Sequence, residues 1–110
     1  MFKIFLKMGV FQITFGDITL SAGLSRQHCC DARFKPEDPD KFEAEDVEVG
    51  LMHTETKDWM TKEIWLQCFG EELYDGVVGW VTPTQFANLV QFLNEQREFA
   101  NFRAKSYITN

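Results

Sequence analysis

A chain of 110 residues has the length of one domain, and its eleven Phe and three Trp supply enough apolar surface for a core without disulfides or a metal. Its net charge of −6 and pI of about 4.8 argue against direct nucleic-acid binding, which normally needs a basic surface. No apolar stretch reaches the length of a membrane span, and polar residues interrupt the apolar start, so we expect neither a membrane segment nor a signal peptide.

Three cysteines are an odd number, and two of them, Cys29 and Cys30, are adjacent. A secreted disulfide framework usually shows an even set at spaced positions. Reduced thiols fit this pattern better, and we therefore expect a cytoplasmic protein.

Residues 2–20 alternate between apolar and polar side chains, which is the period of a half-buried strand. The apolar positions are Phe2, Ile4, Leu6 and Met8, then Phe11, Ile13 and Phe15, then Ile18 and Leu20. Gly9 and the Gly16-Asp17 pair suit turns between these runs. The segment 2–20 is therefore predicted to form a β-meander.

Residues 21–46 show no clear period and contain Pro36 and Pro39 among acidic residues. This segment is predicted to be an irregular acidic loop. Alternation returns in 47–81, where strands are predicted at 47–53, 64–69 and 77–81. The polar segment 54–62 is expected to be an exposed hairpin tip, and Asp75-Gly76 is expected to form a second hairpin turn.

The segment 82–103 carries a helix signature. Thr82 is a good N-cap, Pro83 suits the first helical position, and Gln85 completes a capping-box pattern. An apolar stripe follows at helical spacing: Phe86, Leu89, Val90, Leu93 and Ala100. The predicted fold is a single α+β domain, residues 1–110, with an antiparallel sheet of five or six strands and one long C-terminal helix packed on one face.

Side chains capable of metal binding or nucleophilic chemistry do not form a recognised pattern. The candidates are His28, Cys29, Cys30, Asp31, His53 and Cys68. Consecutive ligands do not reproduce zinc-site spacing, and no catalytic signature or phosphate-binding loop is present. We predict no catalytic residue, no metal and no cofactor.

Charge is segregated along the chain. Residues 37–75 contain thirteen acids and three bases, a balance of −10, whereas the rest of the chain has four acids and eight bases. The predicted partner-binding residues are the densest acidic run with one aromatic: Glu37, Asp38, Asp40, Glu43, Glu45, Asp46, Glu48 and Trp59. Such a run presents a strong negative field to a basic partner, and Trp is enriched among interface anchors. The competing interpretation is that the acids keep the protein soluble and protect sheet edges.

These features predict a small acidic binding protein with a basic protein partner. A sharper form is an inhibitor that imitates nucleic acid and occupies a basic nucleic-acid-binding groove, as small acidic proteins of viral or mobile-element origin do. One alternative is a structural subunit of a larger assembly or homo-oligomer, in which the N-terminal strands or the helix face with Phe92, Phe99 and Phe102 pack on neighbours. A second alternative is a small cysteine-dependent enzyme.

Overall fold

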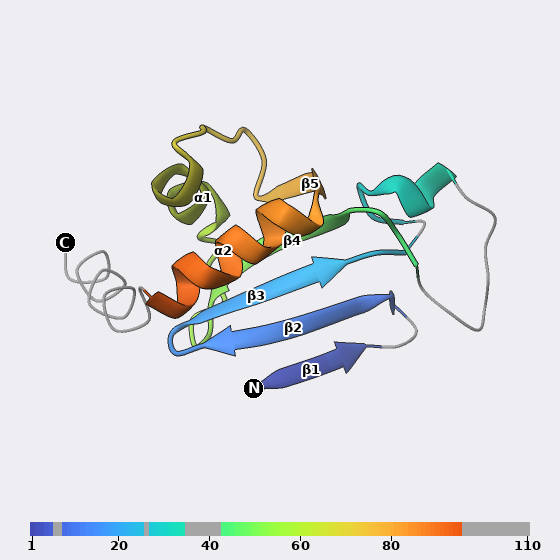
Figure 1. Ribbon diagram of the computed structural model, residues 1–110. Coiled ribbons are helices and arrows are strands. Elements are labelled where there is room, and N and C mark those ends of the chain that lie inside the picture. Colours follow the sequence, from blue (N-terminus) through green and yellow to red (C-terminus); the bar gives the residue numbers. More distant parts are fainter. Residues whose placement is uncertain (6–7, 26, 35–42, 96–110) are drawn as a thin grey trace.

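The computed structural model describes residues 1–5, 8–25, 27–34 and 43–95, and the side chains of residues 33 and 34 are not among those described (Figure 1). Five antiparallel strands form one sheet in the order β1-β2-β3-β4-β5. Their bounds are β1 (Phe2–Phe5), β2 (Val10–Phe15), β3 (Ile18–Gly23), β4 (Val47–His53) and β5 (Val77–Val81). The helices are the short 3₁₀ helix η2 (Asp31–Phe34), α1 (Thr61–Phe69) and α2 (Pro83–Glu95).

The predicted N-terminal meander is confirmed. Each of the first three strands pairs antiparallel with the next, and residues of one face stay in register: Phe11 lies opposite Ala22, and Ile13 opposite Leu20. Because side chains alternate across a strand, this register keeps the apolar set on one face of the sheet. The third strand extends three residues beyond its predicted end at Leu20.

The core lies between that face and α2, which runs roughly along β3 in Figure 1. Its fully buried members come from β3, β4, β5, α1 and α2: Ile18, Leu20, Ala22, Val49, Leu51, Ile64, Trp65, Val81, Leu89 and Leu93. Phe11 meets Phe86 of α2 edge-to-face, with ring centroids 6.0 Å apart. The α+β prediction with a helix on one face of an antiparallel sheet is therefore confirmed.

The capping box of α2 is also confirmed. The Gln85 backbone N–H donates to Thr82 Oγ1 at 3.2 Å, and the Thr82 backbone N–H donates to Gln85 Oε1 at 3.0 Å. These bonds satisfy two backbone donors at the start of the helix. The described helix has 13 residues and is short rather than long. The predicted continuation from 96 to 103 lies outside the described residues.

The strand predicted at 64–69 is wrong, because Thr61–Phe69 forms α1. Ile64 and Trp65 are buried while Leu66 and Gln67 are exposed, which is a helical and not a strand pattern. Over so few residues an alternating apolar pattern fits either period, so the sequence signal was ambiguous. The helix ends at Gly70, whose φ of +68° is a left-handed conformation suited to glycine, and its N–H donates to the Leu66 carbonyl at 2.8 Å.

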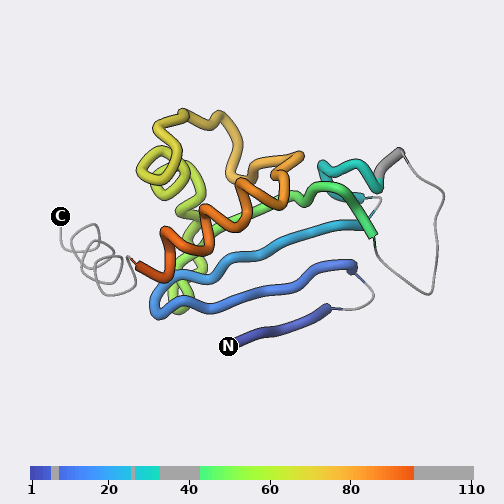
Figure 2. The backbone as a smooth tube through the Cα atoms, in the orientation of Figure 1, coloured from blue at the N-terminus to red at the C-terminus, as the bar shows by residue number. Residues whose placement is uncertain are grey.

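This correction changes the whole connection between β4 and β5. After a turn at residues 54–56 the chain runs back beside β4 as far as Met60, forms α1 and returns through a loop to β5 (Figure 2). Asp75-Gly76 therefore does not join two paired strands, and the hairpin predicted there is wrong. The exposed hairpin tip predicted at 54–62 is confirmed only in part: an exposed turn follows β4 and Trp59 then pairs antiparallel with Met52, but Thr61 and Lys62 belong to α1.

Candidate functional site

Glu48 and Trp59 lie on the face of the sheet opposite α2. In β4 the side chains of Val49 and Leu51 enter the core, so the Glu48 side chain points to the opposite face, and Gly50 belongs to that face as well. Trp59 lies over Gly50, where a Cβ would come within 2.6 Å of the Trp59 ring. The backbone of Trp59 pairs with Met52 in an isolated bridge, and its side chain remains 54 % exposed. The absence of a side chain at Gly50 therefore makes room for an exposed aromatic ring beside Glu48.

Two of the predicted partner-binding carboxylates have internal roles. Asp46 Oδ1 accepts the Asp31 N–H at 2.6 Å at the start of η2, and Asp31 Oδ1 in turn accepts the Glu45 N–H at 2.7 Å. Glu48 Oε2 accepts the Cys29 N–H at 2.8 Å. A carboxylate that accepts a backbone N–H satisfies a donor that would otherwise lack a partner. Asp46 and Glu48 therefore hold residues 29–31 against the start of β4.

Cys29, in the segment held by Asp46 and Glu48, also contacts β5, at a point where the pairing of β5 with β4 is irregular. Between the pairs Val47–Val81 and Val49–Val78, β5 contains one residue more than β4, which is a β-bulge. Trp80 in this bulge has a φ of +52°, uncommon for a bulky residue. Its N–H donates to the Cys29 carbonyl at 2.7 Å, which replaces a bond of the sheet ladder. The bulge turns Trp80 outward, where its side chain is exposed.

The other predicted acids divide into two groups. Glu43 and Glu45 are exposed beside η2, at the end of the sheet where β4 begins. Glu37, Asp38 and Asp40 lie outside the described residues. The predicted set is therefore not one continuous surface within the described part of the chain: two members are exposed, two support the loop, and Trp59 lies further along β4.

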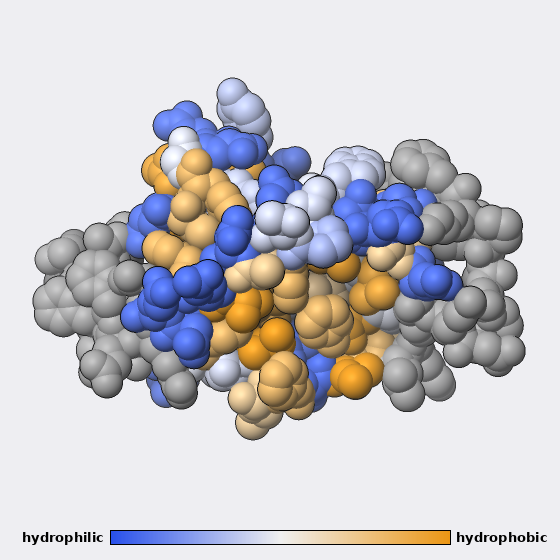
Figure 3. Space-filling model, in the orientation of Figure 1, coloured by the Kyte–Doolittle hydropathy of each residue, from blue (hydrophilic) through white to orange (hydrophobic). Residues whose placement is uncertain are grey.

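A second group of acids lies in the connection between β4 and β5. We call it the β4–β5 acidic surface, and it consists of Glu55, Asp58, Glu63, Glu71, Glu72 and Asp75, all of them exposed. Two lysines, Lys57 and Lys62, lie among them, and hydrophilic side chains gather over the loop that follows α1 (Figure 3). These six acids belong to the acidic region 37–75 of the sequence. The predicted partner-binding residues did not include them, because the acids there were taken from the denser run 37–48.

Two exposed aromatic side chains accompany this surface. Tyr74, between Glu72 and Asp75, is 94 % exposed. A Cβ at Gly76 would lie 4.0 Å from Trp59, so the loop that carries Tyr74 returns close to the Trp59 ring. Thr61 Oγ1 fixes that return, because it donates to the Gly76 carbonyl at 2.6 Å and accepts the Leu51 N–H at 2.9 Å.

The side chains that the sequence offers as metal ligands or nucleophiles, all of them described, do not form one site. Within the described part of the chain no three His, Cys, Asp or Glu side chains are placed to hold a metal ion. His28 Nδ1 lies 2.7 Å from Ser25 Oγ, and His53 Nδ1 accepts backbone N–H groups of the turn that follows it. Burial raises the pKa of the Cys68 thiol, the direction opposite to that of an activated nucleophile.

No family model, curated protein or solved structure matches this chain. None of the helices in the described residues combines the length and the apolar character that crossing a bilayer requires. The functional inference therefore rests on the acidic and aromatic surfaces described above.

Proposed function

We propose that this protein is a non-catalytic binding domain whose β4–β5 acidic surface docks on a basic surface of a partner protein. The observation that carries the proposal is the exposure of all six carboxylates of this surface. They differ in this respect from Asp46 and Glu48, which accept backbone hydrogen bonds inside the protein. Exposed carboxylates that make no hydrogen bond within the described part of the chain remain available to a partner.

Charge and aromatic contact supply different parts of the binding energy. Clustered carboxylates attract and orient a basic partner over a distance comparable to the Debye length. Trp59 and Tyr74 then offer apolar area that loses water on contact, the property typical of interface anchors. Both side chains lie in the connection that carries the acids, so one partner surface can cover them together.

A basic groove that binds nucleic acid is the partner surface that fits best. Such grooves are lined by Lys and Arg placed for phosphates, and carboxylates can occupy the same positions. The protein is then an inhibitor that competes with nucleic acid for the groove. Duplex DNA should release a captured partner, because both ligands need the same basic side chains.

The test is capture of a partner from lysate with tagged protein, at about 50 mM and about 500 mM salt, since exposed charges are screened at high salt. We expect a basic protein at low salt, lost at high salt and released by duplex DNA. The triple variant Glu71→Lys, Glu72→Lys, Asp75→Lys should lose this capture while its circular dichroism spectrum stays unchanged.

The matched control is the triple variant Glu43→Lys, Glu45→Lys, Glu95→Lys, which changes the net charge equally at exposed positions elsewhere. This control should retain most of the capture. Undiminished capture by the first variant, or equal loss in both, contradicts the assignment to the β4–β5 acidic surface.

A further inference from the structure

Within the described part of the chain, the outer edge of β1 is open. β1 is the first strand in the sheet order, so among the described strands it has a neighbour, β2, on one side only. The Thr14 N–H donates to the Met1 carbonyl at 2.9 Å, and Met1 continues the β1–β2 register by one residue. Because backbone groups alternate in direction along a strand, Lys3 and Phe5 bond to β2. The N–H and C=O groups of Phe2 and Ile4 therefore point away from the sheet.

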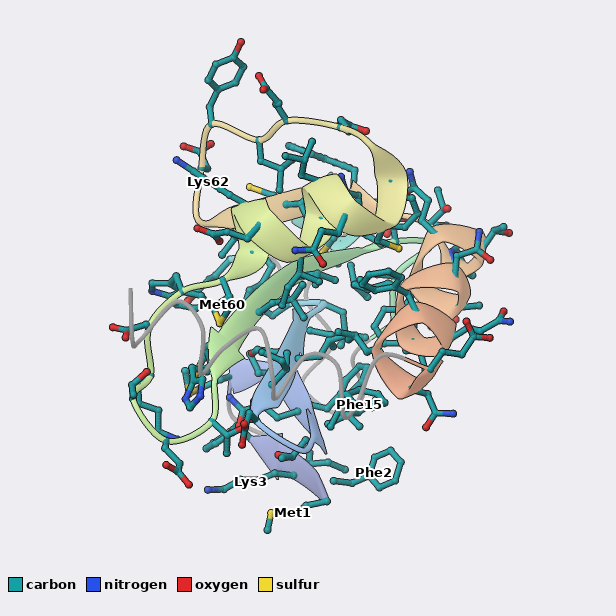
Figure 4. All side chains as sticks on the ribbon, turned by 90° about the vertical axis from the view of Figure 1, so that its left-hand side faces the viewer. Met1, Phe2, Lys3, Phe15, Met60 and Lys62 are labelled. Carbon is teal, nitrogen blue, oxygen red and sulfur yellow. The ribbon has the colours of Figure 1, made fainter. Side chains whose placement is uncertain are left out.

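The side chains of these two residues are also exposed. Phe2 is 78 % exposed and Ile4 67 %, although the register places both on the face that α2 covers further along the sheet. Figure 4 shows Phe2 and Phe15 on the side of α2 and Lys3 on the opposite side. Apolar side chains gather over this part of the sheet (Figure 3). The apolar face of the sheet thus continues past α2 to the open edge.

The edge has little of the protection that edge strands usually carry. β1 pairs with β2 without a register shift, and it contains no proline. Its only charged side chain is Lys3, on the face opposite Phe2 and Ile4. Open backbone groups next to apolar side chains are a template for the addition of another strand.

We propose that β1 pairs antiparallel with β1 of a second copy of this chain, with Ile4 facing Ile4 on the two-fold axis. The two sheets then form one continuous sheet with α2 of each copy on the same side. This proposal is independent of the acidic surface and adds a second contact to the molecule.

A second copy fits because an antiparallel strand edge is self-complementary under two-fold symmetry. With Ile4 on the axis, the outward N–H and C=O of each Ile4 bond to those of the other copy. Lys3 then lies opposite Phe5 of the second copy, a favourable pairing, since Lys3 Nζ already lies 5.2 Å from the Phe5 ring centroid within one chain. If the two strands were shifted so that Lys3 lay on the axis, the lysines of the two copies would face each other and repel. We reject that register for this reason.

Charge also directs two copies to this edge. A net charge of −6 makes copies repel one another at most orientations. The described acids of the β4–β5 connection and of the start of β4 lie away from β1, on the side of the sheet that ends in β5. β1 itself carries no acid, so approach through β1 keeps the acidic surfaces of the two copies apart.

The proposed dimer is tested by measuring the molar mass of the full chain by light scattering after size-exclusion chromatography. We expect the wild type at twice the 12.8 kDa of one chain. Ile4→Lys and Ile4→Glu should each have the mass of one chain, because like charges meet on the axis. An equimolar mixture of the two variants should recover the doubled mass, because only self-pairing at residue 4 places Lys opposite Glu. Met8→Lys, at another exposed apolar position of the same hairpin, should remain dimeric.

Oxidation of Ile4→Cys provides a second readout that needs no charged substitution. Facing residues of a hydrogen-bonded pair have Cα atoms about 5.5 Å apart, within disulfide reach, whereas residue 3 lies about 7–8 Å from its own copy. Ile4→Cys should therefore give a covalent dimer and Lys3→Cys should not. A wild type with the mass of one chain at high concentration, a mixture that stays monomeric, or equal cross-linking of both cysteine variants overturns the proposal.

Discussion

Three strand glycines accommodate loop side chains on the face of the sheet opposite α2. A Cβ at Gly23 would collide with the His28 ring, one at Gly50 with the Trp59 ring, and one at Gly79 with Cys29 Cβ. Glycine weakens a strand interior, so its presence in β3, β4 and β5 indicates close approach and not strand propensity. These contacts determine where residues 28–29 and Trp59 lie against the sheet.

The cost of filling these glycine positions should depend on what lies above them. Gly79→Ala places a Cβ 2.6 Å from Cys29 Cβ and 3.1 Å from the Cys29 carbonyl oxygen. Neither atom can move without the backbone, so we expect a loss of about 1–3 kcal/mol in the free energy of unfolding. Gly50→Ala should cost less, because the exposed Trp59 ring can turn away. Urea unfolding of both variants checks this order, and a Gly50→Ala cost equal to or above that of Gly79→Ala contradicts it.

Secondary-structure elements are held by side chains at their ends. The hydroxyl of Thr61 joins the first residue of α1 to β4 and to the loop before β5, and the capping box begins α2 directly after β5. The Thr61 hydroxyl bonds to backbone groups of β4 and of the loop before β5, whereas the Thr82 hydroxyl accepts an N–H that the start of α2 leaves unpaired. The positions of α1 and α2 on the sheet therefore depend on a few hydroxyl groups as well as on apolar packing.

Removal of the α2 cap should destabilise the protein measurably. Thr82→Ala removes the oxygen that accepts the Gln85 N–H, and we expect a loss of about 0.5–2 kcal/mol in the free energy of unfolding. Thr84→Ala is the matched control, because Thr84 is exposed within the first turn and its side chain caps no helix end. Thermal unfolding compares the two variants. Equal stabilities would show that the capping box contributes nothing in solution.

At the scale of the whole molecule, acidic and apolar surfaces lie at different edges of the sheet. The β4–β5 acidic surface accompanies α1 beyond the last strands, and the apolar edge is that of β1, the first strand. A binding surface for a basic partner and a self-pairing edge can therefore be occupied at the same time. A dimer would present the acidic surface twice, which strengthens binding to a repeated or extended basic partner.

Salt should then affect the two proposed contacts in opposite directions. Binding to a basic partner should weaken as salt rises from about 50 mM to about 500 mM, because the attraction is screened. Dimerisation should strengthen over the same range, because each copy carries a net charge of −6 and the repulsion between copies is screened. Sedimentation equilibrium at both salt concentrations measures the dimer. Weaker dimerisation at high salt would show that charge pairs, and not β1 strand pairing, hold the copies together.

Local patterns were sufficient to predict the meander and the start of α2. Alternation over complete strands, turn glycines and the Thr82–Gln85 capping box each depend on residues close together in the chain. The strand predicted at 64–69 was wrong because so short a segment contains too few apolar positions to distinguish a helix from a strand. The predicted partner-binding residues were chosen by density along the chain, and density does not show which carboxylates accept backbone N–H groups inside the protein.

The sequence by itself determined the α+β class, the segregation of charge and the apolar alternation of the N-terminal strands. The tertiary structure decided which acids serve the fold and which face outward. Asp46 and Glu48 accept N–H groups from residues 15 and 19 positions away, and neither partner can be read from a neighbouring residue. It also decided that Phe2 and Ile4 stay exposed on an apolar face, because how far α2 reaches across the sheet depends on packing between distant segments.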